Sequence, residues 1–148
     1  MPEKETLERA KEDKREGKAP STQAGEFVRE EIEHVREGKH GARSAKQAIA
    51  IGLSKARRAG VDLPPPKEGE ASKSTRKQAA RDIRKGASAG KAKKSAKRSR
   101  AASAALKREG KSAASKTALS RHARSAAKKR SAASRSRSAK KAAATRKK

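Results

Sequence analysis

The 148-residue sequence has no cysteine, tryptophan or tyrosine, and its single phenylalanine is Phe27. Without cysteine, the chain has neither a disulfide framework nor a thiolate metal site. A chain this poor in aromatic residues has little material for a large core. It also lacks the stacking platforms on which single-stranded nucleic-acid modules hold bases. Globular folding is therefore expected to be local.

Long apolar runs are absent as well. No stretch approaches the roughly 18 apolar residues that a membrane-spanning helix needs. The charged first twenty residues lack the apolar segment of a secretory signal. We therefore expect a soluble protein of the cytoplasm.

Negative charge is scarce, above all in the second half of the chain. Lys and Arg total 43 against 16 Asp and Glu, which gives a net charge of +27. Residues 1–60 hold 14 basic and 11 acidic side chains, whereas residues 83–148 hold 24 basic side chains and one acidic residue, Glu109. This excess favours a polyanion as partner.

A proline run marks the change in composition. Residues 64–66 are all proline, which fixes φ, removes backbone donors and favours an extended chain. The sequence therefore predicts a small helical domain (1–63), a Pro-containing linker with a possible short helix (64–82) and a basic low-complexity tail (83–148).

Apolar periodicity predicts a mainly α fold built on a helical hairpin. The first helix spans about 21–37 and the second about 44–59, with Gly38 and Gly41 breaking the chain between them. The stripe of the first helix is Ala24, Val28, Ile32 and Val35, with Phe27 on its flank; that of the second is Ala45, Ala48, Ile49, Gly52, Leu53 and Ala56. The pattern predicts an antiparallel pair.

Two further segments flank this hairpin. Val61 and Leu63 are expected to pack over its open end. The segment 3–16 has helix formers but Leu7 as its only large apolar side chain. It predicts a fraying helix that adds little to a core.

The tail (residues 83–148) consists largely of Ala, Ser, Lys and Arg. Alanine favours helix, but cations three and four residues apart repel one another, and there is little apolar surface to bury. We expect a largely disordered tail with latent helices. Phosphates that neutralise the cations should convert it from coil to helix.

The tetrapeptide Arg-Glu-Gly-Lys occurs at 15–18, 36–39 and 108–111. Its glycine suits a left-handed helix stop. A serine that can cap the next helix follows each copy, at Ser21, Ser44 and Ser115. We interpret the repeat as a helix terminator and not as a binding motif.

Ile51 lies off the apolar stripe of its helix. Either Val61, Leu63 or the N-terminal segment covers it, or it is a contact for a homodimer or a protein partner.

Patterns typical of catalysis and of cofactor sites are missing. His34 and His40 lie near Glu30, Glu33 and Glu37, but no recognised ligand spacing supplies a first coordination shell. Residues 86–92 have one residue too few between their glycines for a nucleotide-binding loop. No catalytic side chain has a partner defined by sequence. We therefore expect no metal, no cofactor and no enzymatic activity.

Residues 21–32, together with the segment KHGARSAKQAIAIGLSKARRAG at 39–60, resemble a family of small, uncharacterised bacterial proteins with a domain of unknown function and basic tails. The likeness spans about residues 5–130. It implies a bacterial origin and carries over no activity. The tail separately resembles the Ala/Lys-rich arms of bacterial histone-like proteins and linker histones.

Taken together, these features predict a nucleoid-associated, histone-like protein that binds duplex DNA largely independently of sequence by neutralising phosphates. The alternatives are a protein-interaction module tethered to nucleic acid by its tail and an RNA- or ribosome-associated protein. The expected phosphate contacts are Lys91, Lys93, Lys94, Lys97, Arg98, Arg100, Lys128, Lys129, Arg130, Lys140 and Lys141 of the tail, with Arg43, Lys46, Lys55, Arg57 and Arg58 of the second helix.

Overall fold

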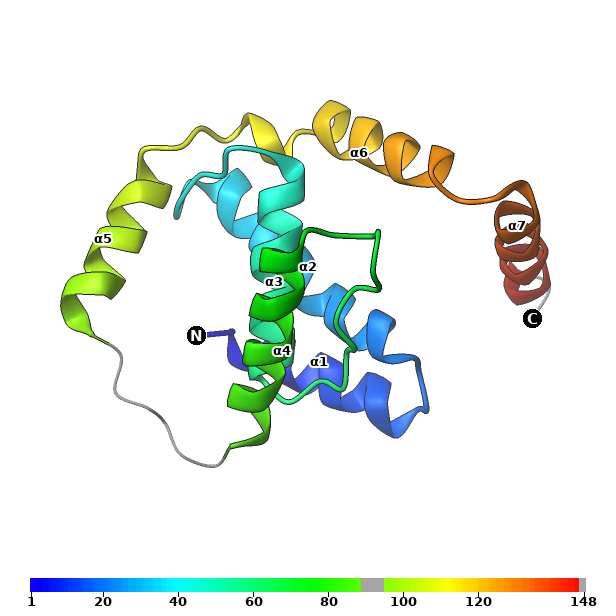
Figure 1. Ribbon diagram of the computed structural model, residues 1–148, viewed down its shortest axis with the longest axis horizontal. Helices are drawn as coiled ribbons and strands as arrows, with labels where there is room; N and C mark the ends of the chain where they lie inside the picture. Colours follow the sequence, from blue (N-terminus) through cyan, green and yellow to red (C-terminus); the bar gives the residue numbers. More distant parts are fainter. Residues whose placement is uncertain (89–94, 147–148) are drawn as a thin grey trace.

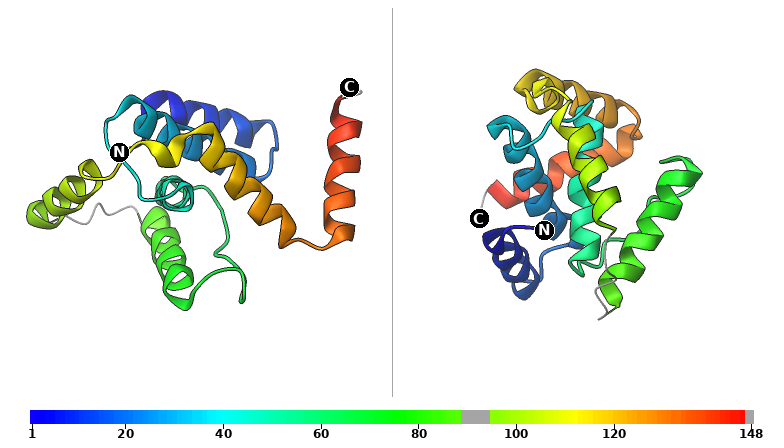
Figure 2. Two further views of the ribbon diagram at one scale, coloured as in Figure 1. Left: turned by 90° about the horizontal axis from the view of Figure 1, so that it is seen from above. Right: turned by 90° about the vertical axis from the view of Figure 1, so that its left-hand side faces the viewer.

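The predicted helix pair is confirmed by the computed structural model, which describes residues 1–88 and 95–146. Its members are α2 (Pro20–Glu37) and α3 (Ala45–Arg58), which form the centre of a mainly α-helical molecule (Figure 1). The two helices cross steeply instead of lying antiparallel, as the views in Figures 1 and 2 show. A Cβ atom added to Gly52 would lie 2.6 Å from Cα of Val28, so this glycine sets how closely the backbones approach.

One apolar cluster lies between α2, the end of α3 and α1 (Lys4–Arg15). Its buried members are Ala10, Ala24, Phe27 and Ala56. Val61 and Leu63 pack against it, as predicted. The expectation that the N-terminal segment adds little to a core is wrong, because Ala10 is buried and Leu7 is partly buried on the same cluster.

A second apolar cluster joins the hairpin to the tail. Ile32, Val35, Ala42 and Ala48 are buried together with Ala113 and Ala114, which belong to the short 3₁₀ helix η1 (Ser112–Ala114). The side chain of Arg36 donates a hydrogen bond to the Ala114 carbonyl, at 3.0 Å. Part of the tail therefore completes the core of the hairpin.

A further helix, α4 (Lys73–Ala87), packs against α3. Its Asp82 accepts hydrogen bonds from Ser54 and Arg58 of α3, each at 2.7 Å. Ile51 lies one turn before Ser54 and is half-buried, so α4 packs beside the face that carries Ile51, while Val61 and Leu63 pack elsewhere. A dimer or partner contact through Ile51 stays a prediction.

The remaining helices are α5 (Ala96–Lys107), α6 (Lys116–Lys128) and α7 (Ala132–Arg146). None of their described residues is buried. In Figures 1 and 2, α5 and α7 lie apart from the bundle, whereas α6 begins against it. Disorder of the free tail stays a prediction.

The three Arg-Glu-Gly-Lys copies differ in detail. α1 and α2 end at the first two, where Gly17 and Gly38 have φ of 71° and 79°, as predicted. α5 ends just before the third copy, but Gly110 is not among the described glycines with positive φ, so the left-handed stop is wrong there.

The predicted serine caps are confirmed at two of the three positions. Ser44 and Ser115 cap α3 and α6 by accepting a hydrogen bond from a backbone amide. Ser21 does not cap α2, which begins one residue earlier at Pro20 with Ala19 as its N-cap. Proline suits the first helical position because its φ is already helical and its missing N–H has no partner to lose there.

None of the helices within residues 1–88 and 95–146 combines the length and the hydropathy needed to cross a bilayer.

Candidate nucleic-acid interface

Most of the predicted tail cations are exposed on α5, α6 and α7. Lys97, Arg98 and Arg100 lie on α5, and Lys140 and Lys141 on α7. The others, at the end of α6 and just beyond it, are Lys128, Lys129 and Arg130. Lys91, Lys93 and Lys94 lie outside the residues that the structure describes, as does part of the 86–92 stretch.

The predicted cations in and just before α3 divide into two groups. Arg43, which precedes the N-cap, and Lys46, in the first turn, are exposed, and Arg43 Nε lies 3.6 Å from Oε1 of Glu109. Near the end of α3, the side chains of Lys55, Arg57 and Arg58 form ion pairs or hydrogen bonds with other residues of the folded domain.

Each of these three has a well-defined partner. Lys55 pairs with Glu30 and Glu31, and Arg58 with Asp82. Arg57 is 7% exposed and donates to the carbonyls of Leu63 and Pro64. Burial lowers the pKa of the Arg57 guanidinium, while Asp82 opposes that shift. Lys55, Arg57 and Arg58 therefore hold the fold together, and we leave them out of the interface.

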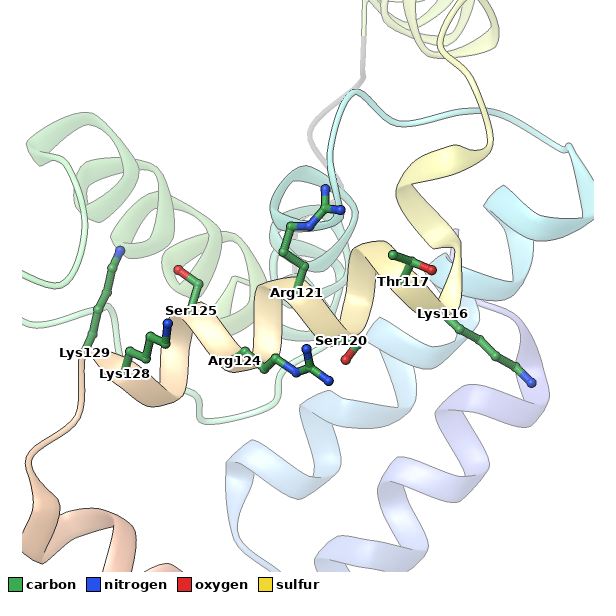
Figure 3. Close-up of a pocket in the computed structure, with 8 residues that line it drawn as sticks. All are labelled: Lys116, Thr117, Ser120, Arg121, Arg124, Ser125, Lys128 and Lys129. Carbon is green, nitrogen blue, oxygen red and sulfur yellow. The ribbon is translucent and has the colours of Figure 1, made fainter.

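A set of exposed cations also lies along α6. An open pocket follows this helix, and Figure 3 shows its side chains. They are Lys116, Thr117, Ser120, Arg121, Arg124, Ser125, Lys128 and Lys129. The spacing of Thr117, Arg121, Arg124 and Lys128 places these four on one side of the helix. We call these four residues the cationic face of α6.

The opposite side of α6 holds the helix on the bundle. Leu119 is partly buried against the cluster of Ile32, Val35 and Ala114. Because Leu119 faces inward, the cationic face of α6 points away from the core. The predicted phosphate contacts did not include Lys116, Arg121 and Arg124. The sequence does place these cations on either side of Leu119, the one large apolar residue of this helix, and that pattern could have identified them.

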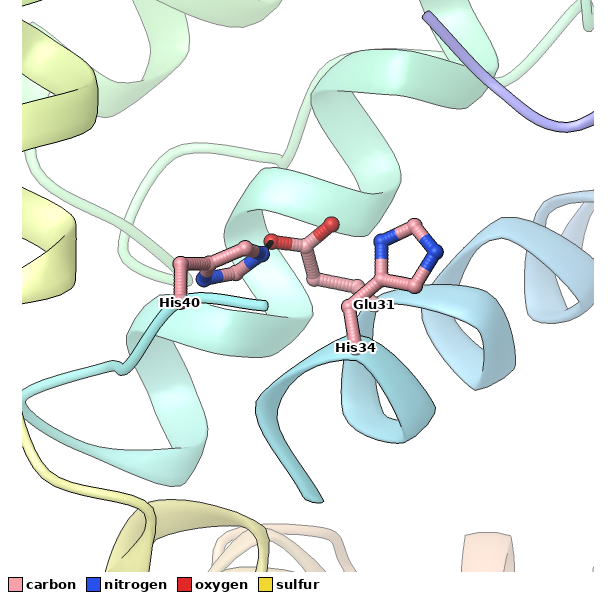
Figure 4. Close-up of side chains that lie close together, drawn as sticks. All are labelled: Glu31, His34 and His40. Carbon is pink, nitrogen blue, oxygen red and sulfur yellow. Dashed lines mark ion pairs between the residues drawn. The ribbon is translucent and has the colours of Figure 1, made fainter. Parts of the chain in front are cut away.

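The structure also brings together three side chains that can bind metal. Glu31, His34 and His40 each offer a ligand atom, and these atoms all lie within 4.8 Å of one another. In Figure 4 the Glu31 carboxylate lies between the two imidazole rings. The sequence pointed to Glu30, Glu33 and Glu37 as the neighbouring carboxylates, whereas the buried Glu31 completes the cluster.

Comparison with protein families matches residues 17–67 to a family of unknown function (DUF6496). The match covers α2, α3 and the proline run, and is shorter than the span of about 5–130 expected from the sequence. No curated protein and no solved structure matches the chain.

Proposed function

We propose that this protein is a non-enzymatic, nucleoid-associated bacterial protein that binds duplex DNA largely independently of sequence. Phosphates are neutralised by the cationic face of α6 and by the exposed cations of α5 and α7 (Figures 1 and 3). Arg43, just before α3, and Lys46 in its first turn add contacts from the folded domain.

The cationic face of α6 is the observation that carries this proposal. Leu119 anchors one side of the helix, so Arg121, Arg124 and Lys128 are displayed together on the other. No Asp or Glu follows Glu109 in the sequence, so no carboxylate from α6 or α7 competes with a phosphate. Such a surface binds a backbone of regularly spaced phosphates.

Base-specific recognition has little support in this chain. Phe27, the single aromatic ring of Phe, Tyr or Trp type, is 1% exposed in the core and cannot stack on a base. Binding dominated by phosphates is sequence-tolerant and strongly salt-dependent.

A charge-neutralising variant tests the interface. Replacing Arg121, Arg124 and Lys128 together by Gln should weaken duplex binding and lower the slope of log K against log salt by roughly two to three, since each phosphate contact contributes about 0.9. Gel shifts or fluorescence anisotropy across a salt series measure both quantities.

The matched control removes three exposed cations from α1, as Lys11→Gln, Lys14→Gln and Arg15→Gln. Its net charge equals that of the α6 variant, so a nearly unchanged slope is expected. Equal losses in the two variants would mean that total charge and not the α6 surface determines binding. The same series on folded RNA and on single-stranded DNA tests the RNA-associated alternative, which tighter RNA binding would support. Equally tight and steeply salt-dependent binding of all three by the tail alone would favour the protein-interaction module tethered to nucleic acid by its tail, and no binding to any of them would overturn the proposal.

A further inference from the structure

The carboxylate of Glu31 lacks adequate partners. Glu31 is 1% exposed, and neither of its oxygens accepts a well-aligned hydrogen bond from the described residues. The nearest charged group is Lys55 Nζ, 2.6 Å from Oε2. Lys55 also pairs with Glu30, which is 2% exposed, at 3.3 Å. Two buried carboxylates thus share one ammonium group, and a buried charge is costly unless it is balanced.

The two histidines turn a free ring nitrogen toward this carboxylate. His40 Nδ1 lies 3.0 Å from the Gly41 carbonyl oxygen, which only accepts, so Nδ1 carries hydrogen. In the neutral ring, a lone pair then remains on Nε2, which lies 3.0 Å from Oε1 of Glu31. Two electron-rich atoms therefore face each other at this distance, and the geometry calls for a cation beside them.

In His34 the roles of the two ring nitrogens are exchanged relative to His40. Its Nε2 lies 2.9 Å from Oε1 of Glu3, which leaves Nδ1 as the nitrogen with a lone pair. Histidines that bind metals in proteins usually donate their other N–H to a carbonyl or a carboxylate, which fixes the ring. Both His34 and His40 meet this condition.

We propose that Glu31, His34 and His40 bind a divalent transition-metal ion, for which Zn²⁺ is the best match. Two imidazole nitrogens and a carboxylate oxygen form a ligand set that zinc accepts, with a fourth position left for water or another ligand. The ligand atoms lie within 4.8 Å of one another, so small side-chain rotations bring them to bonding distance. Lys55 on Oε2 leaves Oε1 for the metal. The side chains of His34 and His40, at 12% and 17% exposure, give the ion access from solvent.

Metal binding at this site would stiffen the place where the tail docks. His40 belongs to the loop between α2 and α3, where the amides of Gly41 and Ala42 donate to the carbonyls of Leu106 and Gly110, at 2.9 and 3.1 Å. A metal bound to His40 ties this loop to α2. Because the ion binds the folded chain, it should raise the unfolding temperature.

The test uses the full chain without a polyhistidine tag. Titration with Co²⁺ should give one equivalent of binding, with visible absorption bands typical of tetrahedral coordination that Zn²⁺ abolishes by displacement. Loss of a direct ligand should weaken Co²⁺ binding by more than about 100-fold in each of the variants His34→Gln, His40→Gln and Glu31→Gln. Replacing an outer partner, meaning a residue that only hydrogen-bonds to a ligand, typically costs about 10–100-fold. Glu3→Gln, which alters such an outer partner, should weaken it roughly 10-fold.

His122→Gln is the matched control, since His122 lies on α6 outside the cluster, and binding should not change. His34 lies at the rim, so His34→Gln keeps the test valid if Glu31→Gln fails to fold by circular dichroism. A folded His34→Gln chain that binds Co²⁺ as tightly as the wild type would overturn the proposal. So would a wild-type chain with no saturable Co²⁺ binding.

Discussion

Asp82 shows how a single buried acid attaches a helix to this small core. It is 1% exposed and accepts hydrogen bonds from Ser54, Arg58 and Gln78. Burial acts to raise the pKa of Asp82, but the hydrogen bonds from Ser54 and Arg58 outweigh it, and the pKa lies below its ordinary value. The ionised form is therefore the one that the fold stabilises.

Asp82→Asn should lower the free energy of unfolding by about 1.5–3 kcal/mol near neutral pH, the usual value of hydrogen bonds to a charged group. Since the folded-state pKa is depressed, this contribution is complete above the ordinary aspartate pKa and is lost as the pH falls through the folded value. Urea unfolding should show a constant gap between wild type and variant from about pH 5 to 7, and a narrower gap below about pH 4. Asp62→Asn, at an exposed acid, is the control and should show no such gap. A gap that persists at low pH would mean that packing and not charge explains the loss.

Gly41 is a second residue on which the tertiary structure depends. A Cβ at this position would overlap the backbone carbonyl of Glu109, in the tail segment that packs on the loop. Backbone atoms cannot move aside as a flexible side chain can. Gly41 is therefore required by close approach and not by a special φ.

Gly41→Ala should destabilise docking of the tail segment by about 1–3 kcal/mol, a typical cost of overpacking. Hydrogen exchange by NMR should show faster exchange at the Ala42 amide, which donates to the Gly110 carbonyl. Gly25→Ala is the matched control, because a Cβ there meets nothing within 4 Å, and in the middle of α2 it should stabilise by about 0.5–1 kcal/mol. Unchanged Ala42 exchange in a folded Gly41→Ala chain would argue against this contact.

At the scale of elements, the tail helices differ in how they are held. α6 is held on the bundle by Leu119, which packs partly buried against a core cluster, whereas, among the described residues, neither α5 nor α7 contributes an apolar side chain to either core cluster. α7 also carries cations at Arg137, Lys140 and Lys141, whose spacing of three and four residues makes them repel. Burial of an apolar face supplies most helix stability in proteins, so α7 has little of its own.

We therefore predict that duplex DNA increases the helicity of the tail, chiefly in α5 and α7. The helical circular-dichroism signal near about 222 nm should become stronger at saturating DNA. At high salt, which releases the DNA, it should return toward the signal of the free protein. A chain ending at Arg130, which lacks α7, should show a smaller gain. An unchanged signal at saturating DNA would contradict the coil-to-helix prediction.

At the scale of the whole molecule, charge is divided between a nearly balanced bundle and a cationic tail. The carboxylates of α2 have partners within the first 60 residues: Glu26 with Arg9, Glu33 with Arg29, and Glu37 with Lys39. Acids of the bundle are thus neutralised locally. The cations of α5, α6 and α7 remain available for a polyanion, while the docked segment around Ala114 keeps α6 in a defined place.

The sequence by itself determined the central helix pair of this protein, the ends of its first two helices and the distribution of its charge. Apolar periodicity predicted α2 and α3, and Gly17 and Gly38 predicted where α1 and α2 end. These features are local, because a helix face and a left-handed glycine depend on neighbouring residues alone.

Only the tertiary structure decided which helix faces and chain segments pack against one another. Alanine fits a core as well as a solvated helix, so nothing local marks Ala113 and Ala114 as buried against Ile32 and Val35. The same holds for charged side chains: Arg57 and Glu31 read as surface residues, and they become buried because other segments fold over them. The cluster of Glu31, His34 and His40 arises from the turn between α2 and α3, which brings these three side chains together at a sequence spacing that matches no simple motif.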